Sequence, residues 1–272
     1  MTDIVSLDAL VGRISPGSSL AIPMDGAGVS MAATAALIEA GTDGLRLVCV
    51  PISGMQADLL IGANSVAAIE TSAVTLGEAG GAPRFGAAVR EGAFALADST
   101  CPAILAGLLA AQKGVPFMPI AGIIGSDLLS VRKDWKVIDS PVGEPRKVVV
   151  VPAIVPDVAL FHAPEADRAG NIRIGRHREL AAMAYAARRT LVSVERIVER
   201  NLLETEDSAA GVLPALYVDA VAVAERGAWP LPLWDEYDGD GAEVARYAAM
   251  ARSEEGFRAY LSAFLTRRAE VA

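Results

Sequence analysis

The sequence predicts an α/β protein with an open, largely parallel sheet, helices on the sheet faces and a helical C-terminal tail. Short apolar runs alternate with helical patterns along the chain, which is typical of βα units. Glycine or proline marks most of the turns between them. The composition is 53% hydrophobic but only 5% aromatic, which suits tightly packed layers of small aliphatic side chains. We expect one domain over residues 1–272, with the tail at about 240–272.

The first half of the chain contains successive strand and helix patterns separated by glycine-containing loops. In order, we expect a short helix at 6–11, a strand at 19–23, a glycine loop at 25–30, a helix at 31–40, a strand at 45–51, a helix at 57–61 and a strand at 66–72. The repeated order of strand, loop and helix favours parallel strands.

The pattern continues with two helices, each opened by a proline, whose missing N–H costs nothing at a helix start. We expect these helices at 83–91 and 102–112, strands at 147–151, 158–162, 191–194 and 217–223, and one or two helices over 243–268. The polar stretch from 132 to 147, rich in proline, glycine and charge, is interpreted as a surface excursion.

Charge and hydropathy exclude several classes of function. The formal net charge is −9 and no large basic cluster occurs, which argues against a nucleic-acid partner. No apolar run reaches the roughly 18–20 residues of a membrane helix, and the N-terminus lacks a leader pattern. The two cysteines, Cys49 and Cys101, have neither disulfide nor metal spacing. We therefore expect a soluble, cytoplasmic protein with no resident metal.

The glycine loop is the first candidate ligand site. Gly26, Ala27, Gly28 and Ser30 lie where a strand feeds a helix, so their amides suit an anionic or carbonyl oxygen. The spacing is not a dinucleotide fingerprint, because Met31 occupies the third glycine position. A tight turn that merely requires glycine explains the pattern equally well.

Two histidines and one polar turn supply further candidates. His162 ends an expected strand, but a lone histidine there is more often structural than catalytic, and His177 adds no metal-ligand spacing. The turn after it contains Asp167, Gly170 and Asn171, which suit either a backbone-stabilised connection or a ligand contact. No serine lies in the G-x-S-x-G pattern of an α/β-hydrolase nucleophile.

Five sequence blocks, found in order along the chain, resemble the A (alpha) subunits of family I CoA-transferases, especially the glutaconate CoA-transferase branch. They are ADLLIGANSVAAIETS at 57–72, GAPRFGAAVREG at 81–92, GVPFMPIAGIIGSDLL at 114–129, VPDVALFHAPEADRAGNIRIG at 155–175 and AARRTLVSVERIVE at 186–199. The resemblance implies an open α/β sheet of the CoA-transferase type. It implies a partner, the similarly folded B (beta) subunit of such enzymes. It also implies CoA thioesters as substrates and no permanently bound cofactor.

In that family a glutamate from the partner B chain attacks the acyl-CoA thioester, which gives an acyl anhydride and then a glutamyl-CoA thioester. The resemblance therefore implies that this chain supplies loop amides and pocket walls. It assigns substrate and oxyanion binding to Gly26, Ala27, Gly28, Ser30 and Ser72, and a CoA-binding role to Gly125, Ser126 and Asp127. The family's Gly-Gly-Phe loop opening is replaced here by Pro23-Met24-Asp25, which puts the acyl pocket in doubt.

The same branch includes ring-cleaving hydrolases of steroid degradation, which resemble this chain in SVERIV at 193–198 and VDAV at 218–221. In those enzymes the resemblance implies a role for a glutamate of the alpha chain, for which Glu70 and Glu78 are the candidates here. A solvated carboxylate is the alternative for both. A CoA-ester or ring-cleaving hydrolase is thus the second functional hypothesis, and a non-enzymatic ligand-sensing module is the third. No helix-turn-helix is apparent to favour a sensor.

Overall fold

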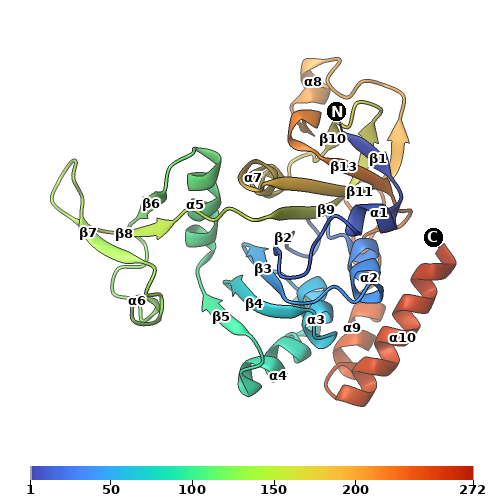
Figure 1. Ribbon diagram of the computed structural model, residues 1–272, viewed down its shortest axis with the longest axis horizontal. Coiled ribbons are helices and arrows are strands. Elements are labelled where there is room, and N and C mark those ends of the chain that lie inside the picture. Colours follow the sequence, from blue (N-terminus) through green and yellow to red (C-terminus); the bar gives the residue numbers. More distant parts are fainter. Residues whose placement is uncertain (1, 272) are drawn as a thin grey trace.

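The chain is built around a ten-stranded sheet whose eight principal strands are all parallel (Figure 1). The computed structural model describes residues 2–271, with side chains through residue 267. Across the sheet the strands are β1 (Asp3–Val5), β13 (Ala220–Val223), β11 (Arg189–Val198), β9 (Val158–Asp167), β2 (Ser19–Pro23), β3 (Leu45–Val50), β4 (Val66–Thr71) and β5 (Ala95–Asp98). The short strands β10 (Ile172–Arg173) and β12 (Val212–Leu213) add to it antiparallel. The predicted parallel α/β fold is confirmed.

Helices cover both faces of this sheet. On one face lie α1 (Leu7–Val11), α2 (Met31–Glu39), α3 (Met55–Gly62), α9 (Gly241–Met250) and α10 (Glu254–Val271), and on the other lie α5 (Cys101–Gln112) and α7 (Arg178–Ala186). The helix α4 (Pro83–Glu91) packs against α3. Shorter pieces are α6 (Leu128–Val131), α8 (Glu206–Ala209), η1 (Gly77–Ala79) and η2 (Ala215–Tyr217). No helix among residues 2–271 is long and apolar enough to cross a membrane.

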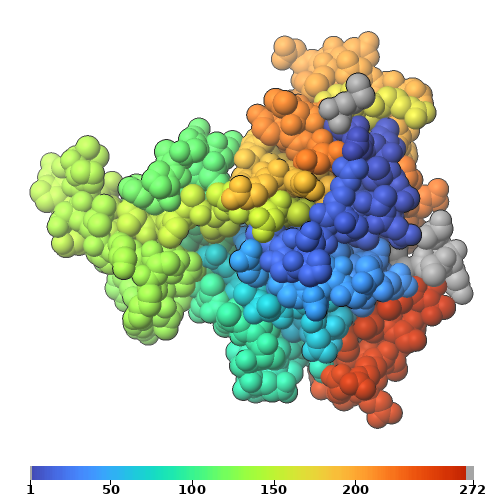
Figure 2. All heavy atoms as spheres, in the orientation of Figure 1, coloured from blue at the N-terminus to red at the C-terminus, as the bar shows by residue number. Residues whose placement is uncertain are grey.

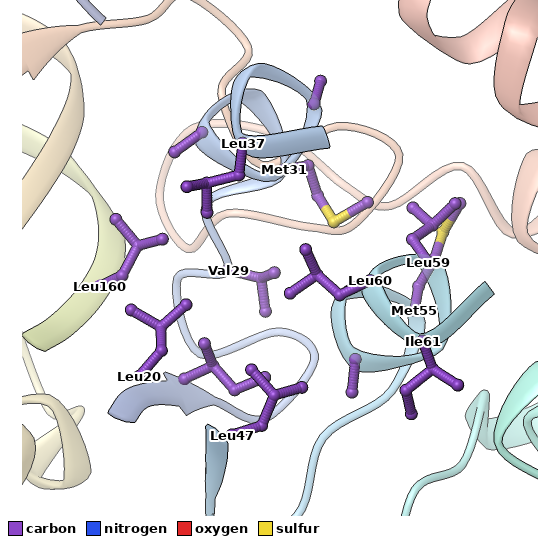
Figure 3. Packing of buried hydrophobic residues seen from close by; sticks show 14 of the residues in the cluster. Leu20, Val29, Met31, Leu37, Leu47, Met55, Leu59, Leu60, Ile61 and Leu160 are labelled. Carbon is purple, nitrogen blue, oxygen red and sulfur yellow. The ribbon is translucent and has the colours of Figure 1, made fainter. Parts of the chain in front are cut away.

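The alternation of side chains along each strand divides the core into two layers. Leu20, Leu47 and Leu160 point to the α2 and α3 side, where they meet Leu37 and Leu60 (Figure 3). Their strand neighbours, such as Ala21 and Phe161, face α5 and α7 instead. Both faces of the central strands are therefore buried, which explains their nearly continuous hydrophobic sequences.

Several elements, among them β5 and α7, were not predicted from the sequence, and two other differences change the expected course of the chain. The strand expected to end at His162 continues to Asp167, through Pro164. Proline is tolerated there because Pro164 falls between the paired positions: β2 pairs with β9 only at Leu20↔Val158 and Ala21↔Ala159, and β10 pairs with it at Ala166. The stretch from 132 to 147, expected as an excursion, contains the strand β7 (Lys136–Asp139).

The strand β7 belongs to an arm that projects from the body of the molecule (Figures 1 and 2). It pairs with β8 (Lys147–Pro152), which also pairs with β6 (Phe117–Ile120), in a separate three-stranded antiparallel sheet. Trp135, Val149 and Val151 form a small core with the α5 residues Ala103 and Ala106. The apolar core of the arm is thus built on α5.

Candidate functional site

The candidate site lies at the carboxyl edge of the parallel sheet, where the strand order reverses. From β2 the chain proceeds outward through β3, β4 and β5, whereas from β9 it proceeds in the opposite direction through β11 and β13. Ligands of open α/β sheets bind in the crevice outside the carboxyl ends of strands at such a switch point. Here the loop after β2 meets the second half of β9 on one side and the loop after β3 on the other.

The glycine loop fills the fork between β2 and β9. Gly26 and Gly28 have φ values of +84° and +78°, in the left-handed region that favours glycine. The carbonyl of Gly28 accepts the backbone N–H of His162 at 2.6 Å. A Cβ atom on Gly28 would lie 2.2 Å from the carbonyl oxygen of His162. The loop is therefore held against β9 so closely that position 28 admits only glycine.

His162 is the centre of a buried polar network rather than an exposed catalytic base. Its Nδ1 lies 2.8 Å from the Ser193 hydroxyl, which lies 2.6 Å from the Ser30 hydroxyl. Its Nε2 lies 2.8 Å from Oε1 of Glu195. The side chains of His162, Ser193 and Ser30 are completely buried. The serine, histidine and carboxylate resemble a nucleophilic triad in order, but substrate does not reach a sealed serine.

Glu195 connects this network to the loop that follows β13. Its carboxylate accepts the N–H groups of Arg226 and Gly227 at 2.7 and 3.0 Å and the Tyr237 hydroxyl at 2.8 Å. Burial alone would raise the pKa of Glu195, but these bonds and the contact with His162 hold that pKa below its ordinary value. Glu195 is thus an ionised anchor that fixes the loop over the sheet edge.

Asp25 is the residue of the glycine loop whose carboxylate is best suited to contact a ligand. Its Oδ2 accepts the N–H of Met55, at the start of α3, at 3.1 Å, while its buried Oδ1 accepts no hydrogen bond from residues 2–271. Burial raises the pKa of Asp25 to about 6, and the nearby charge of Asp58 acts in the same direction. A group that titrates near neutrality at a ligand edge is suited to proton transfer or to recognition of a donor.

Asp25 lines a cavity of about 650 Å³, which we call the loop cavity. Its walls come from η1, from residues 230–232 and from the start of α9. Glu78, exposed in η1, also lines it, so the structure brings one of the two candidate glutamates to the cavity that contains Asp25.

Glu70 lies elsewhere and has a structural partner. Its carboxylate pairs with Arg132 Nη1 at 2.9 Å, and the same guanidinium donates to the carbonyl of Asp98 and stacks on Trp135. Burial raises the pKa of Glu70, although Arg132 opposes that shift. The pair ties β4 to the base of the arm.

The remaining predicted positions fall into two places. The Ser72 hydroxyl donates to the carbonyl of Pro51 at 2.9 Å and lies 3.1 Å from the sulfur of Cys101, at the start of α5. Gly125 and Asp127 are exposed on the arm just before α6, and Ser126 between them accepts the N–H of Leu128. These three residues form a group of their own, apart from the loop cavity.

The turn after His162 is architectural. Asp167 is buried and accepts the N–H groups of Ala169, Asn171 and Leu202, each at 3.0 Å. Gly170 has a φ of +91°, and a Cβ there would lie 2.3 Å from Thr2. The turn therefore carries β9 into β10 and holds the N-terminal segment.

Two functional groups escaped sequence interpretation, namely Glu195 and Tyr237. Ser193 and Glu195 are two residues apart on one strand, so they share a face, and the register places Ser193 beside His162. The signal available in the sequence was this pair of polar residues at i and i+2, next to the apolar residues of the same strand.

No cluster of three or more potential metal ligands occurs within the described part of the chain.

Comparison with known proteins shows which family this chain resembles. The coenzyme A transferase family model matches residues 4–224. The A chain of glutaconate CoA-transferase from Acidaminococcus fermentans is 31% identical over 221 residues, which cover 75% of this chain and 68% of that protein. The corresponding chain of 3-oxoadipate CoA-transferase from Pseudomonas knackmussii is 29% identical, with 97% and 94% of the two chains covered. The IpdA subunit of the cholesterol ring-cleaving hydrolase of Rhodococcus jostii is also 29% identical, with 96% and 91% covered.

Solved structures agree with these sequence matches. The glutaconate CoA-transferase of Acidaminococcus fermentans superposes with a TM-score of 0.88 at 26% identity, covering 96% of this chain and 88% of that one. The decarboxylase AibA/AibB superposes with a TM-score of 0.84 at 27% identity, covering 99% and 98%. The chain therefore belongs to the coenzyme A transferase family, in which it is similar to the alpha subunits.

Proposed function

We propose that this chain is the alpha subunit of a heteromeric acyl-CoA transferase that moves CoA between carboxylic acids. The observation that carries the proposal is that the serine, histidine and carboxylate array at the sheet edge is sealed in the interior. This array does not reach substrate, which supports a reacting nucleophile from a partner chain. A partner B subunit with a nucleophilic glutamate supplies it, and the enzyme works in the cytoplasm.

The chemistry proceeds in balanced transfer steps. The partner's glutamate attacks the thioester carbonyl, the C–S bond breaks, and CoA leaves as the thiolate. The acyl group is then bound to the glutamate as an anhydride. The thiolate then attacks the glutamyl carbonyl, which releases the donor acid and forms glutamyl-CoA. Reversal with a second carboxylate completes the exchange. Loop amides around Gly26 and Gly28 stabilise the developing oxyanion, Ser72 adds a further substrate contact after β4, and residues 125–127 contact CoA.

A hydrolase is the second candidate, favoured by the IpdA similarity, which extends over 96% of the chain. In that reaction a carboxylate of this chain activates water. Glu78 is the better placed of the two candidate glutamates, because it is exposed at the loop cavity, whereas Glu70 is paired with Arg132.

The decisive experiment uses the complex of this chain with its B-like partner. Acetyl-CoA or succinyl-CoA is incubated with a panel of carboxylic acids, and new CoA esters and free CoA are measured separately. Exchange that requires an acceptor acid, with a hydroxylamine-sensitive thioester on the partner, supports the transferase. Exchange that persists after substitution of the partner's glutamate contradicts it. Release of free CoA without acceptor identifies a hydrolase, and Glu78→Gln then tests the proposed base.

A further inference from the structure

The loop cavity has a largely apolar lining, and all of its ionisable lining residues are acidic. Its buried apolar walls include Leu76 and Leu231, and prolines at 230 and 232 complete the roof. Its ionisable lining residues are Asp25, Glu78 and Asp240, and none of the residues that line it is Lys, Arg or His. An anionic group that enters this cavity meets only like charge from the chain itself.

Asp25 is fixed in this lining and has an unused acceptor. Gly54 lies against its carboxylate so closely that a Cβ there would be 2.1 Å from Oδ2 and 2.6 Å from the carbonyl oxygen of Thr75. Oδ2 is also held by the Met55 N–H. Oδ1 is buried and has no hydrogen-bond partner among the described residues, although a buried acceptor without a donor is destabilising. A ligand that brings a donor to Oδ1 satisfies it.

Within the proposed function, we infer that the loop cavity receives the acyl group and selects an uncharged, largely apolar acyl chain that carries a hydrogen-bond donor. An acyl chain that ends in a second carboxylate is excluded by charge. Asp25 determines this specificity, because it is the buried carboxylate of the lining that has an unused acceptor. Asp240 contributes less, because its carboxylate already accepts the Glu243 N–H at 3.0 Å.

The test uses the complex of this chain with its B-like partner and three CoA esters. Valeryl-CoA and glutaryl-CoA differ by a terminal carboxylate, and 3-hydroxyvaleryl-CoA adds a hydroxyl donor to the valeryl chain. We expect kcat/KM to fall in the order 3-hydroxyvaleryl-CoA, valeryl-CoA, glutaryl-CoA. In Asp25→Asn, which keeps the side-chain shape but removes the charge, the glutaryl to valeryl ratio of kcat/KM should rise about tenfold. Glu78→Gln should raise that ratio less, because Glu78 is exposed.

Glu39→Gln is the matched control, because Glu39 is exposed at the end of α2, on the opposite edge of the sheet. It should leave the ratio unchanged. Calorimetric binding of valeryl-CoA and glutaryl-CoA to the same complexes separates this inference from the proposed function. A preference for valeryl-CoA that Asp25→Asn abolishes supports the inference even if no CoA is exchanged. Tighter binding of glutaryl-CoA, or a ratio that Asp25→Asn does not move, overturns it.

Discussion

Nε2 of His162 and Oε1 of Glu195 lie 2.8 Å apart, and together they join β9, β11 and the loop after β13 at the carboxyl edge of the sheet. Neither side chain faces a ligand directly, since His162 is fully buried and the Glu195 carboxylate already accepts bonds from Arg226, Gly227 and Tyr237. Their role is to place the loops that do.

Removing the charge of Glu195 should destabilise the fold more than removing a similar charge at the surface. In Glu195→Gln the bonds from His162, Tyr237 and two backbone amides lose their ionic acceptor, so we expect a loss of about 1–3 kcal/mol in the free energy of unfolding. Urea unfolding followed by circular dichroism measures it. Glu199→Gln is the control, because the Glu199 side chain is 76% exposed in its pair with Arg168. Equal losses in the two variants would refute the anchoring role.

Acid should remove the contribution of Glu195. Burial opposes ionisation, but the bonds to the carboxylate prevail and the pKa in the folded state is below the ordinary value of 4.5. A group of this kind stabilises the fold above its unfolded-state pKa and loses that effect as the pH falls through the folded-state value. The difference in unfolding free energy between wild type and Glu195→Gln should therefore be largest at neutral pH and shrink below about pH 4. A difference that is constant with pH would contradict this.

Asp25 should behave in the opposite way. Burial raises its pKa from 3.8 to about 6, so the folded state binds its proton more tightly than the unfolded state does. Its contribution to stability is then greatest below about pH 4 and is lost as the pH rises through 6. The other ionisable side chains that face it are Asp58, Cys49, Glu78 and Asp240. Asp25→Asn should stabilise the protein at pH 7.5 by on the order of 1–3 kcal/mol and change little at pH 4, as thermal unfolding at both pH values will show.

Gly28→Ala should be far more harmful than the same change at Gly17. The two glycines have φ values of +78° and +77°, so both variants incur the same backbone strain of about 1 kcal/mol. Only position 28 adds a steric clash, because the new Cβ would lie 2.2 Å from the His162 carbonyl oxygen, whereas a Cβ at position 17 would have no atom within 4 Å. We expect an additional loss of at least about 2 kcal/mol in Gly28→Ala, measured by urea unfolding. Similar losses in both variants would show that the loop is not held against β9.

Substitution of Glu70 should loosen the arm without affecting chemistry. In Glu70→Gln the buried guanidinium of Arg132 loses one of its two carboxylate partners, while Asp134 remains at 2.7 Å. Proteolysis should cut the segment around residues 121–146 several-fold faster, because the Arg132 anchor is weakened. Turnover of CoA esters should stay within about twofold of wild type. A larger loss of turnover would make Glu70 a catalytic candidate again.

The sequence was informative about the sheet because its strands are buried on both faces and its loops are marked by glycine. The parallel fold, the loop at 25–30 and most helices follow from these patterns. The extension of β9 beyond His162 did not, because the pairing with β11 that stabilises it is made between residues about 30 positions apart. Contacts between residues far apart in the sequence also determine which side chains lie at the candidate site. Glu70 and Glu78 look alike in sequence, yet Arg132 pairs with one of them and the loop cavity lies beside the other.

The sheet is weakly paired between β2 and β9, and we call this junction the seam. Those strands share two paired positions, whereas β9 and β11 share nine. Across the rest of the seam, the bond from His162 to Gly28 and the contact between Ser193 and Ser30 replace the missing ladder. The glycine loop therefore has a structural role in joining the two halves of the sheet, in addition to the binding role that we propose for it. A ligand that binds the glycine loop should restrict motion between the two halves of the sheet. Amide hydrogen exchange in β2 and β9 should therefore slow when such a ligand binds.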